Sequence, residues 1–538
     1  MQKRNIYSRL TELSNKFNCE NIEKTKQINK TKFDTLRQWS LSNGALFNHS
    51  IEFPIAYGPF GYYGVKAKID INSNEAIIFV PRKQMIISKD YEDKFPFIKI
   101  TEEKDDRSNL ILTLILITEE EKGNNSFYKP YLDVLPINDF LIFWDQKSLS
   151  ELDDARIIES VKSLCYEMKE EYNEVVKNER FKNLSLDKFI FFYSHVNSRE
   201  FYINDTTSAL VPLAELFNHD VVKTRYEFYD SENMVFKFTK NLCGNTIEDI
   251  QGTKSSVLPI REITYDPYKE IVLQEDDHKK GDEEDNDGAK NVDLGENDFF
   301  VFATSSAQQF KKGNQLFLNY SKLDNRTSLV HYGFNSIDNY FDSTVLYMEF
   351  DIKNKETLKG VFPKHLKCNK PGIIELKIKI KFRKICENLI KYFRFEHFTT
   401  KSDYYICSFD QKLEHEVISK SIEFLNKHLK ILNDKHSIEN DLSFLEGDKM
   451  TLREMNFVIY RLRRKINLAH QIDLLNKIKS IMEKHQLKDY LSIVEFLEEM
   501  KDVSQYDIDK NCLNKMVKFV VSQQICLSEH NFNNNLCK

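Results

Sequence analysis

Two polar residues end an apolar run in the segment Leu210–Asp220. The amide of Asn218 and the ring of His219 each offer hydrogen-bond donors and acceptors. Such a pair could recognise a polar cofactor through its amino and carboxylate groups. Taken alone, the pair also fits a capped helix end with a satisfied histidine.

Two tyrosines lie downstream, at the ends of two expected elements. A strand-like segment delivers Tyr320, and a short helix-like segment delivers Tyr332 twelve residues later, followed by Gly333 and Phe334. Two tyrosines and a phenylalanine beside a glycine can build a narrow aromatic channel. The alternative is core packing with buried hydroxyls, because tyrosine is common in cores.

Glycines break the chain in quick succession at Gly58, Gly61 and Gly64. Glycines this dense let the backbone approach a ligand closely. The cluster is not a dinucleotide-binding fingerprint, because a strand rather than a helix follows it, and no Gly-Lys-Ser/Thr of a phosphate loop follows either. By itself the pattern favours a hairpin turn.

Arg199 stands at the end of a helix expected from residue 187, within the segment Asn197–Phe201. A guanidinium at a helix end can bind a carboxylate through two parallel hydrogen bonds. Standing alone, this arginine would more often form an ordinary surface salt bridge.

Hydrophobic periodicity indicates the elements that position these residues. Residues 33–45 favour a helix, 53–90 favour two short strands, and 108–200 are mainly helical. Strand-like segments return over residues 221–320. From about residue 345 the alternation over 345–352 and 374–381 predicts strands, and helices are expected at 383–396, 411–433, 450–484, 488–502 and 510–527.

An acidic stretch, Glu275–Asp298, interrupts the second strand region. It cannot bury apolar area, so a disordered insert is expected over about 270–298. Either it is a tolerated solvated loop, which we favour, or it attracts basic substrates.

Composition narrows the function classes. The chain has 538 residues with a formal net charge of -6, so no global basic field points to nucleic acid. Nine cysteines are scattered between Cys19 and Cys537 without a Cys-x-x-Cys pair, which indicates reduced thiols and argues against a cysteine-built zinc site. The apolar run Leu110–Thr118 is too short to span a bilayer. We therefore expect a cytoplasmic or nuclear location, no membrane or nucleic-acid partner, no metal, and a monomer.

Taken together, the segments resemble the SET domain of the Rubisco large-subunit methyltransferase type. The resemblance covers roughly residues 40–345 and keeps the family's order. Its motifs are Gly61–Ala67 with Val80-Pro81-Arg82, Pro130–Pro136 with Phe143-Trp144, Asn197–Phe201, Val211–His219, and Tyr320–Phe334.

The resemblance implies an α+β chain in three parts. A polar lead-in, 1–32, precedes a mostly β SET domain, 33–345, with a helical insert at about 90–200. A mostly helical substrate-binding domain, 346–538, follows. A knot-like crossing should bring residues 217–219 against 318–334.

The resemblance also implies a reaction: transfer of a methyl group from S-adenosyl-L-methionine to a lysine of a protein substrate. Tyr320 would be the catalytic residue, close to the transferring methyl. Cofactor contacts would come from Phe60, Gly61, Tyr62, Tyr63, Arg199, Asn218, His219, Tyr320 and Phe334. Substrate contacts would come from Ser198, Phe201, Glu215 and Tyr332.

Three positions depart from the family pattern. Tyr62-Tyr63 stand between the glycines where one residue is usual, Glu215 stands where Asp is usual, and Arg326-Thr327-Ser328 replace a typical Ala-Glu-Leu. The Asn-His pair and the tyrosines remain, so activity is expected.

Two other functions compete with lysine methylation. Family members that methylate actin histidine carry a Trp before the acidic residue of the Asn-His segment and an Asn two residues after the arginine. Those positions are Ala214 and Phe201 here, which favours lysine. The other alternative is a non-catalytic SET scaffold, against which Asn218, His219 and Tyr320 argue.

Overall fold

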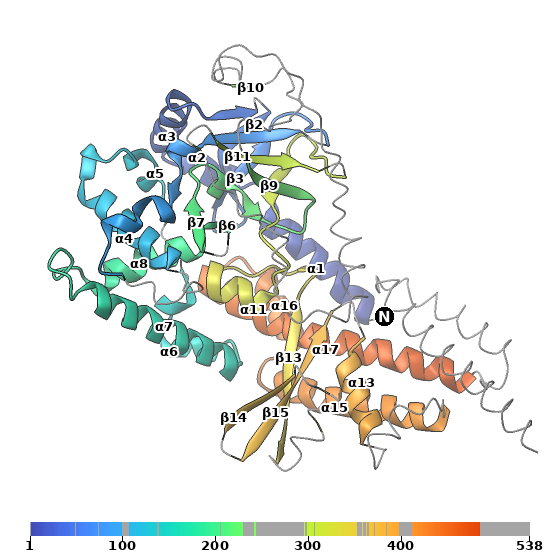
Figure 1. Cartoon of the computed structure of the whole chain (residues 1–538). Coiled ribbons are helices and arrows are strands. Elements are labelled where there is room, and N and C mark those ends of the chain that lie inside the picture. The colour runs from blue at the N-terminus through green and yellow to red at the C-terminus, as the bar shows by residue number, and fades with distance from the viewer. Residues whose placement is uncertain are drawn as a thin grey trace, which may run out of the picture. The chain divides into compact units, whose positions relative to one another are not determined.

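The structure is a computed structural model of the whole chain (Figure 1). It describes residues 2–48, 50–73, 75–98, 107–136, 139–204, 206–229, 242–243, 295, 298–305, 307–351, 358, 362, 365–370, 372–382, 385–396 and 411–484. Two compact units form: unit 1 is Met1–Ser150 with Asp154–Phe334, and unit 2 is Glu151–Asp153 with Asn335–Lys538. Most of the acidic stretch and the helices expected at 488–502 and 510–527 lie outside the described residues.

Unit 1 is built on three small sheets. The first has the order β10 (Leu242–Cys243), β1 (Leu46–Asn48), β4 (Ala76–Pro81), β11 (Phe299–Thr304), β9 (Thr224–Tyr229), with antiparallel neighbours. Every residue of β4 and β11 is buried, as expected for central strands covered on both faces. The third sheet has the order β5 (Ile86–Ile87), β7 (Thr207–Leu210), β6 (Phe201–Asn204).

The second sheet joins the segments that carry the candidate chemistry. Its order is β2 (Ile51–Tyr57), β3 (Tyr62–Ala67), β12 (Gln315–Leu318), β8 (Asn218–His219). The short strands β12 and β8 run parallel, with Phe317 opposite Asn218 and Leu318 opposite His219. The expected juxtaposition of residues 217–219 with the segment from 318 is therefore confirmed.

Helices pack around these sheets in unit 1. The insert contains α4 (Ser108–Glu121), α5 (Lys129–Leu132), α6 (Gln146–Ser150), α7 (Ala155–Val175) and α8 (Leu186–Asn197), which confirms the helical prediction for 108–200. In α4, residues on all sides are buried, because this helix lies inside the core cluster beside α8.

The first 32 residues differ from the expected partly ordered lead-in. They form α1 (Gln2–Asn18) and α2 (Ile22–Gln27), and α3 (Lys30–Ser42) follows. The backbone N–H of Asn21 donates to the carbonyl of Ala56 at 2.7 Å, and the Asn21 side chain caps α2 by accepting from the N–H of Lys24. The short helix α2 thus begins at a side-chain cap and a tertiary contact, which a search for hydrophobic periodicity does not detect.

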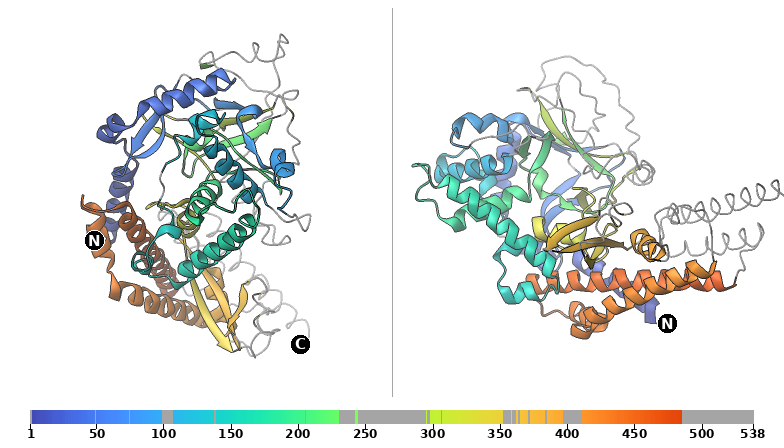
Figure 2. Two further views of the ribbon diagram at one scale, coloured as in Figure 1. Left: turned by 90° about the vertical axis from the view of Figure 1, so that its left-hand side faces the viewer. Right: turned by 60° about the horizontal axis from the view of Figure 1, so that its bottom comes forward.

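Unit 2 combines a sheet with long helices. β13 (Ser343–Asp351), β15 (Ile373–Lys381) and β14 (Leu366–Lys370) form an antiparallel sheet with β15 central. The helices are α13 (Glu387–Phe395), α15 (Gln411–Lys435), α16 (Ile438–Glu446) and α17 (Leu452–Lys484), and α15 lies alongside α17 (Figure 2). The short helix α16 was not expected.

Candidate active site

Tyr320 is fixed by the parallel pairing of β8 and β12, directly after β12. Its backbone N–H donates to Nδ1 of His219 at 3.1 Å, and its hydroxyl donates to the carbonyl oxygen of Phe217 at 2.7 Å. The rings of His219 and Tyr320 lie 5.1 Å apart between centroids. Two hydrogen bonds from one residue to the segment 217–219 tie the two sequence-predicted motifs into one site.

Burial determines the protonation of these two side chains. Desolvation lowers the pKa of His219 to about 4 and raises the pKa of Tyr320 to about 12. Near neutral pH the imidazole is therefore neutral and its Nδ1 accepts, while the phenol keeps its proton and donates. Tyr320 in this state cannot act as a general base.

Asn218 connects the site to the glycine cluster. Its Nδ2 donates to the carbonyl oxygen of Tyr63 at 3.0 Å. A side chain at Gly64 would clash, because an added Cβ would lie 3.0 Å from Nδ2 of Asn218 and 2.6 Å from Nε2 of Gln315. Glycine at position 64 therefore permits β3 to approach the Asn218 amide, and the Oδ1 of Asn218 accepts no hydrogen bond from the described residues.

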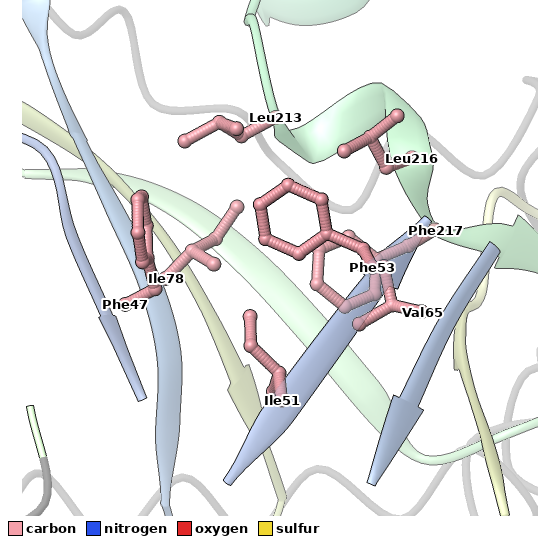
Figure 3. A pocket seen from close by; sticks show the side chains of 8 residues that line it. All are labelled: Phe47, Ile51, Phe53, Val65, Ile78, Leu213, Leu216 and Phe217. Carbon is pink, nitrogen blue, oxygen red and sulfur yellow. The ribbon is translucent and has the colours of Figure 1, made fainter. Parts of the chain in front are cut away.

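A strained turn presents the acidic residue and the Asn-His pair. Leu213 has φ 75° and ψ −42°, a conformation that costs a leucine about 1–3 kcal/mol. Its side chain is buried with Phe217, and with the partly buried Leu216 these residues line an apolar pocket that strands β1 to β4 complete (Figure 3). Burial of Leu213 and Phe217 offsets the strain and fixes the turn. The pocket is lined only by apolar side chains: Phe47, Ile51, Phe53, Val65, Ile78, Leu213, Leu216 and Phe217.

Arg199 follows α8 and is held from two sides. Its Nε donates to Nδ1 of His195 at 3.3 Å, and its Nη1 lies 3.4 Å from Oε2 of Glu215. Desolvation and the adjacent guanidinium lower the pKa of His195 to about 3, so this imidazole is neutral and can accept. Within the described residues, Nη2 of Arg199 has no hydrogen-bond partner.

Glu215 is nearly inaccessible, with a side chain 3% exposed. The hydroxyl of Tyr131, in α5, lies 2.9 Å from both carboxylate oxygens. Desolvation is the largest effect and raises the pKa of Glu215 to about 7, against the opposing influence of Arg199, Tyr131 and the N–H of Val211. Both oxygens of this residue, predicted to bind substrate, therefore face protein partners.

Aromatic rings continue from Tyr320. The ring of Tyr332 lies 5.4 Å from that of Tyr320 and 6.2 Å from that of Phe334, which in turn lies 6.1 Å from His219. Burial raises the pKa of the Tyr332 phenol far above neutrality. The predicted aromatic set thus surrounds one place at the end of β12.

Sequence reasoning missed Tyr226. It lies on β9, its ring meets the edge of Phe201 at 5.0 Å, and it stacks on Phe300 at 5.5 Å. Burial raises the pKa of its phenol to about 12. The strand-like alternation over 221–320 placed it on a strand, but no motif marked its ring as part of the site.

The turn that carries Tyr332 is anchored by one of the departures from the family pattern. Arg326 donates from Nη2 to Oγ of Ser160 at 2.7 Å and to the carbonyl of Arg156 at 3.0 Å, both in α7. Gly333 ends the turn with φ 75°, the left-handed conformation that favours glycine. Arg326 therefore has a structural role in joining the insert to the segment 328–332.

Other predicted residues are placed less centrally. The Ser198 hydroxyl donates to the carbonyl of His195 at 3.2 Å, so it closes the end of α8. Phe60, Gly61 and Tyr62 are partly exposed at the tip between β2 and β3. Tyr63 is 38% exposed, and its ring meets Phe33 edge-on at 5.3 Å.

The described ranges contain no group of three or more His, Cys, Asp and Glu side chains that could hold a metal ion. None of the described helices combines the length and apolarity needed to cross a bilayer.

No family model matches the chain. The protein-lysine N-methyltransferase EFM1 of Saccharomyces cerevisiae is 23% identical over 340 residues, covering 60% of this chain and 53% of that protein. The chloroplastic Rubisco large-subunit N-methyltransferase of Nicotiana tabacum is 26% identical over 197 residues, 35% of this chain and 38% of that protein. The actin-histidine N-methyltransferase of Canis lupus familiaris is 24% identical over 245 residues, 42% of this chain and 41% of that protein. The chain thus spans about half the length, or less, of these curated relatives.

The solved structure of Rubisco LSMT bound to sinefungin and monomethyllysine matches over 90% of this chain and 99% of that one. The TM-score is 0.54 at 17% sequence identity. The chain therefore has the fold of that enzyme, with a SET domain followed by a region rich in helices. The α+β fold class expected from the sequence is confirmed.

Proposed function

We propose that this protein is an S-adenosyl-L-methionine-dependent protein-lysine N-methyltransferase. The observation that carries the proposal is the place of Tyr320: its hydroxyl and its N–H are fixed on residues 217–219, and its ring lies beside those of Tyr332 and His219, both of which contact Phe334. One relative named above is a protein-lysine N-methyltransferase, and the Rubisco LSMT structure named above holds monomethyllysine, which supports the same reaction.

The residues around Asn218 fit the proposed cofactor. S-adenosyl-L-methionine supplies a methyl group already activated on a sulfonium. Arg199 keeps Nη2 for a carboxylate, and Asn218 keeps Oδ1 for an ammonium group. We assign the remaining contacts to Phe60, Gly61, Tyr62, Tyr63, His219 and Phe334.

This chain's own residues then have three tasks: to orient the methyl group, to desolvate the lysine amine and to exclude water from the site. The Tyr320 oxygen, whose proton is directed at Phe217, presents its lone pairs for weak C–H···O contacts. The aromatic surroundings of Tyr332 and Phe201 disfavour a charged lysine and lower its pKa, so it can attack as the neutral amine. No general base is needed, and alignment supplies most of the acceleration.

Phe201 and its neighbours favour lysine over histidine. Phe201 is buried against Tyr226 and Phe300, so this wall offers rings rather than an amide that could hydrogen-bond an imidazole. Ala214 is also buried, and its methyl group is much smaller than the tryptophan that the actin-histidine enzymes carry at this position. The actin-histidine relative keeps histidine methylation as the second candidate.

The proposal extends to partners and organisation. We assign residues 33–345 to the SET domain and 346–538 to a domain that binds a lysine-bearing protein substrate, with the chain acting as a monomer in the cytoplasm or nucleus. Of the four predicted substrate contacts we keep Phe201 and Tyr332 on the substrate side. Ser198 closes the end of α8, and Glu215 pairs with Arg199. The scattered cysteines support a reducing compartment.

The test is transfer of a labelled methyl group from S-adenosyl-L-methionine into a protein extract, with modified residues mapped by mass spectrometry. Label on lysine that is reduced in Asn218→Ala is the expected result. Label on histidine would replace the lysine proposal. If the cofactor binds but extracts from several sources stay unlabelled, the scaffold alternative holds.

A further inference from the structure

We propose that Tyr131, in the helical insert, is a positioning residue that acts through Glu215 to orient Arg199 for the cofactor. The proposal rests on the proposed function, because it concerns the affinity of the same site for S-adenosyl-L-methionine. Neither the sequence motifs nor the relatives' names assign a role to this tyrosine.

The geometry forms a chain of contacts from the insert to the site. The Tyr131 hydroxyl lies 2.9 Å from both oxygens of Glu215, and one of those oxygens lies 3.4 Å from Nη1 of Arg199. Tyr131 is itself buried, so its hydroxyl cannot turn to water. A buried phenol without its partner, or a buried carboxylate without its donor, is costly, so each side chain holds the other in place.

Glutamate at position 215 makes the chain of contacts sensitive to protonation. The ion pair with Arg199 is long, and an ionised Glu215 supplies the charge that holds Nη1 toward the turn 213–217. Since Nε is held by His195, fixing Nη1 also fixes the direction of Nη2. Protonation of Glu215 removes the attraction at Nη1.

Tyr131, Tyr320 and Arg199 lie around Glu215, and His195 contacts Arg199. Tyr131 and Tyr320 keep their protons across the range pH 6 to 9, since burial raises the pKa of both phenols. Arg199 is the cation of the ion pair. His195, which shares Arg199, is neutral there because its pKa is lowered to about 3. Glu215, with a pKa near 7, is the member of the cluster that changes charge.

Tyr131→Phe removes the hydroxyl donor, which raises the pKa of Glu215 further. At pH 7 we expect S-adenosyl-L-methionine to bind this variant about 10-fold more weakly than wild type, the order of one lost hydrogen bond to a charged group. At pH 9, where the variant carboxyl also ionises, the two affinities should converge. Calorimetric titration between pH 6 and 9 measures both.

The matched control is Tyr128→Phe. Tyr128 is a second buried tyrosine of the insert, and its hydroxyl donates to the carbonyl of Met85 at 3.1 Å rather than to Glu215. This variant should leave the pH profile of cofactor affinity unchanged. A shift in Tyr128→Phe equal to that in Tyr131→Phe would overturn the proposal.

If Tyr131→Phe weakens cofactor binding equally at every pH, the role of Tyr131 is merely structural. If cofactor affinity does not change at all, Tyr131 has no role in binding. If Tyr131→Phe does not fold, Glu215→Gln serves instead, and it should abolish the pH-dependent step near 7 in cofactor affinity. Persistence of that step would overturn the proposal. Failure of the wild type to bind S-adenosyl-L-methionine would refute the proposed function itself.

Discussion

Two buried ion clusters, one in each unit, use charge differently. In unit 2, Oδ1 of Asp441 accepts from Nη2 of Arg461 at 2.7 Å and from Nε at 2.9 Å, while Oδ2 accepts from Lys465. Asp441 and Lys465 are each 1% exposed. In unit 1, Glu215 has one cation at 3.4 Å and a neutral hydroxyl.

The difference separates a stabilising cluster from a responsive one. Asp441 is shared between two cations with short hydrogen bonds, and Arg461 also reaches Glu151 at 2.9 Å. Glu215 is desolvated without full compensation, so its pKa rises to about 7. A buried carboxylate that is hydrogen-bonded to two cations has a stabilising role. A buried carboxylate with only one distant cation gains or loses its proton near neutral pH.

The largest effect on stability is expected at Asp441, the buried carboxylate with the most hydrogen bonds to cations. Asp441→Asn leaves Arg461 and Lys465 buried without their shared carboxylate, which should cost about 3–5 kcal/mol of unfolding free energy. Urea unfolding, analysed transition by transition, measures the loss. A loss below 1 kcal/mol would show that water reaches this cluster, and the comparison would fail.

Glu215→Gln should change how stability depends on pH. Because the folded-state pKa of Glu215 is raised, its contribution is fully present below pH 4.5 and is lost as pH rises to about 7. Wild type should therefore lose about 2–3 kcal/mol relative to Glu215→Gln between pH 4.5 and pH 8. Thermal unfolding of both proteins at each pH tests this, and a constant difference would mean that Glu215 stays ionised.

Tyr320→Phe isolates the hydroxyl that sits between the two motifs. It should reduce methyl transfer by about 10- to 100-fold, with less than about threefold change in cofactor affinity, because the hydroxyl orients rather than binds. Steady-state kinetics beside a binding titration separates the two quantities. Equal turnover would remove Tyr320 from the mechanism.

The smallest effect is expected for an exposed pair, which sets the baseline. Lys26 and Glu23 form a 3.0 Å ion pair with side chains 66% and 78% exposed. Glu23→Gln should change the unfolding free energy by less than about 0.5 kcal/mol. A larger change would indicate that α2 stabilises unit 1 more than its exposed surface suggests.

The sequence predicted the elements that carry strong local signals. Strands β3 and β4, helix α4 and the long helices α15 and α17 follow from periodicity, whereas β2 and β5 in the same region were not expected. The meeting of Asn218 with the Tyr320 segment followed from the family resemblance. Helices α1, α2 and α16 were missed. α16 has nine residues and begins at a Ser437 cap, a signal too short for periodicity to detect.

The candidate site was predicted as a set of residues rather than as a set of contacts. Arg199 was predicted to contact the cofactor and Glu215 the substrate, but the structure pairs the two side chains with one another. Tyr131 lies 84 positions before Glu215, and only the folded chain brings α5 to the turn 213–217. Nothing in the spacing of these residues indicates that contact.

The most direct measurement is calorimetric titration of the purified protein with S-adenosyl-L-methionine, beside Asn218→Ala and Glu23→Gln. We predict saturable binding of about one equivalent, weakened about 10-fold in Asn218→Ala because a polar group of the ligand loses its partner, and unchanged in Glu23→Gln. Absence of saturable binding in the wild type would contradict a methyl-donor site at residues 199, 218 and 320.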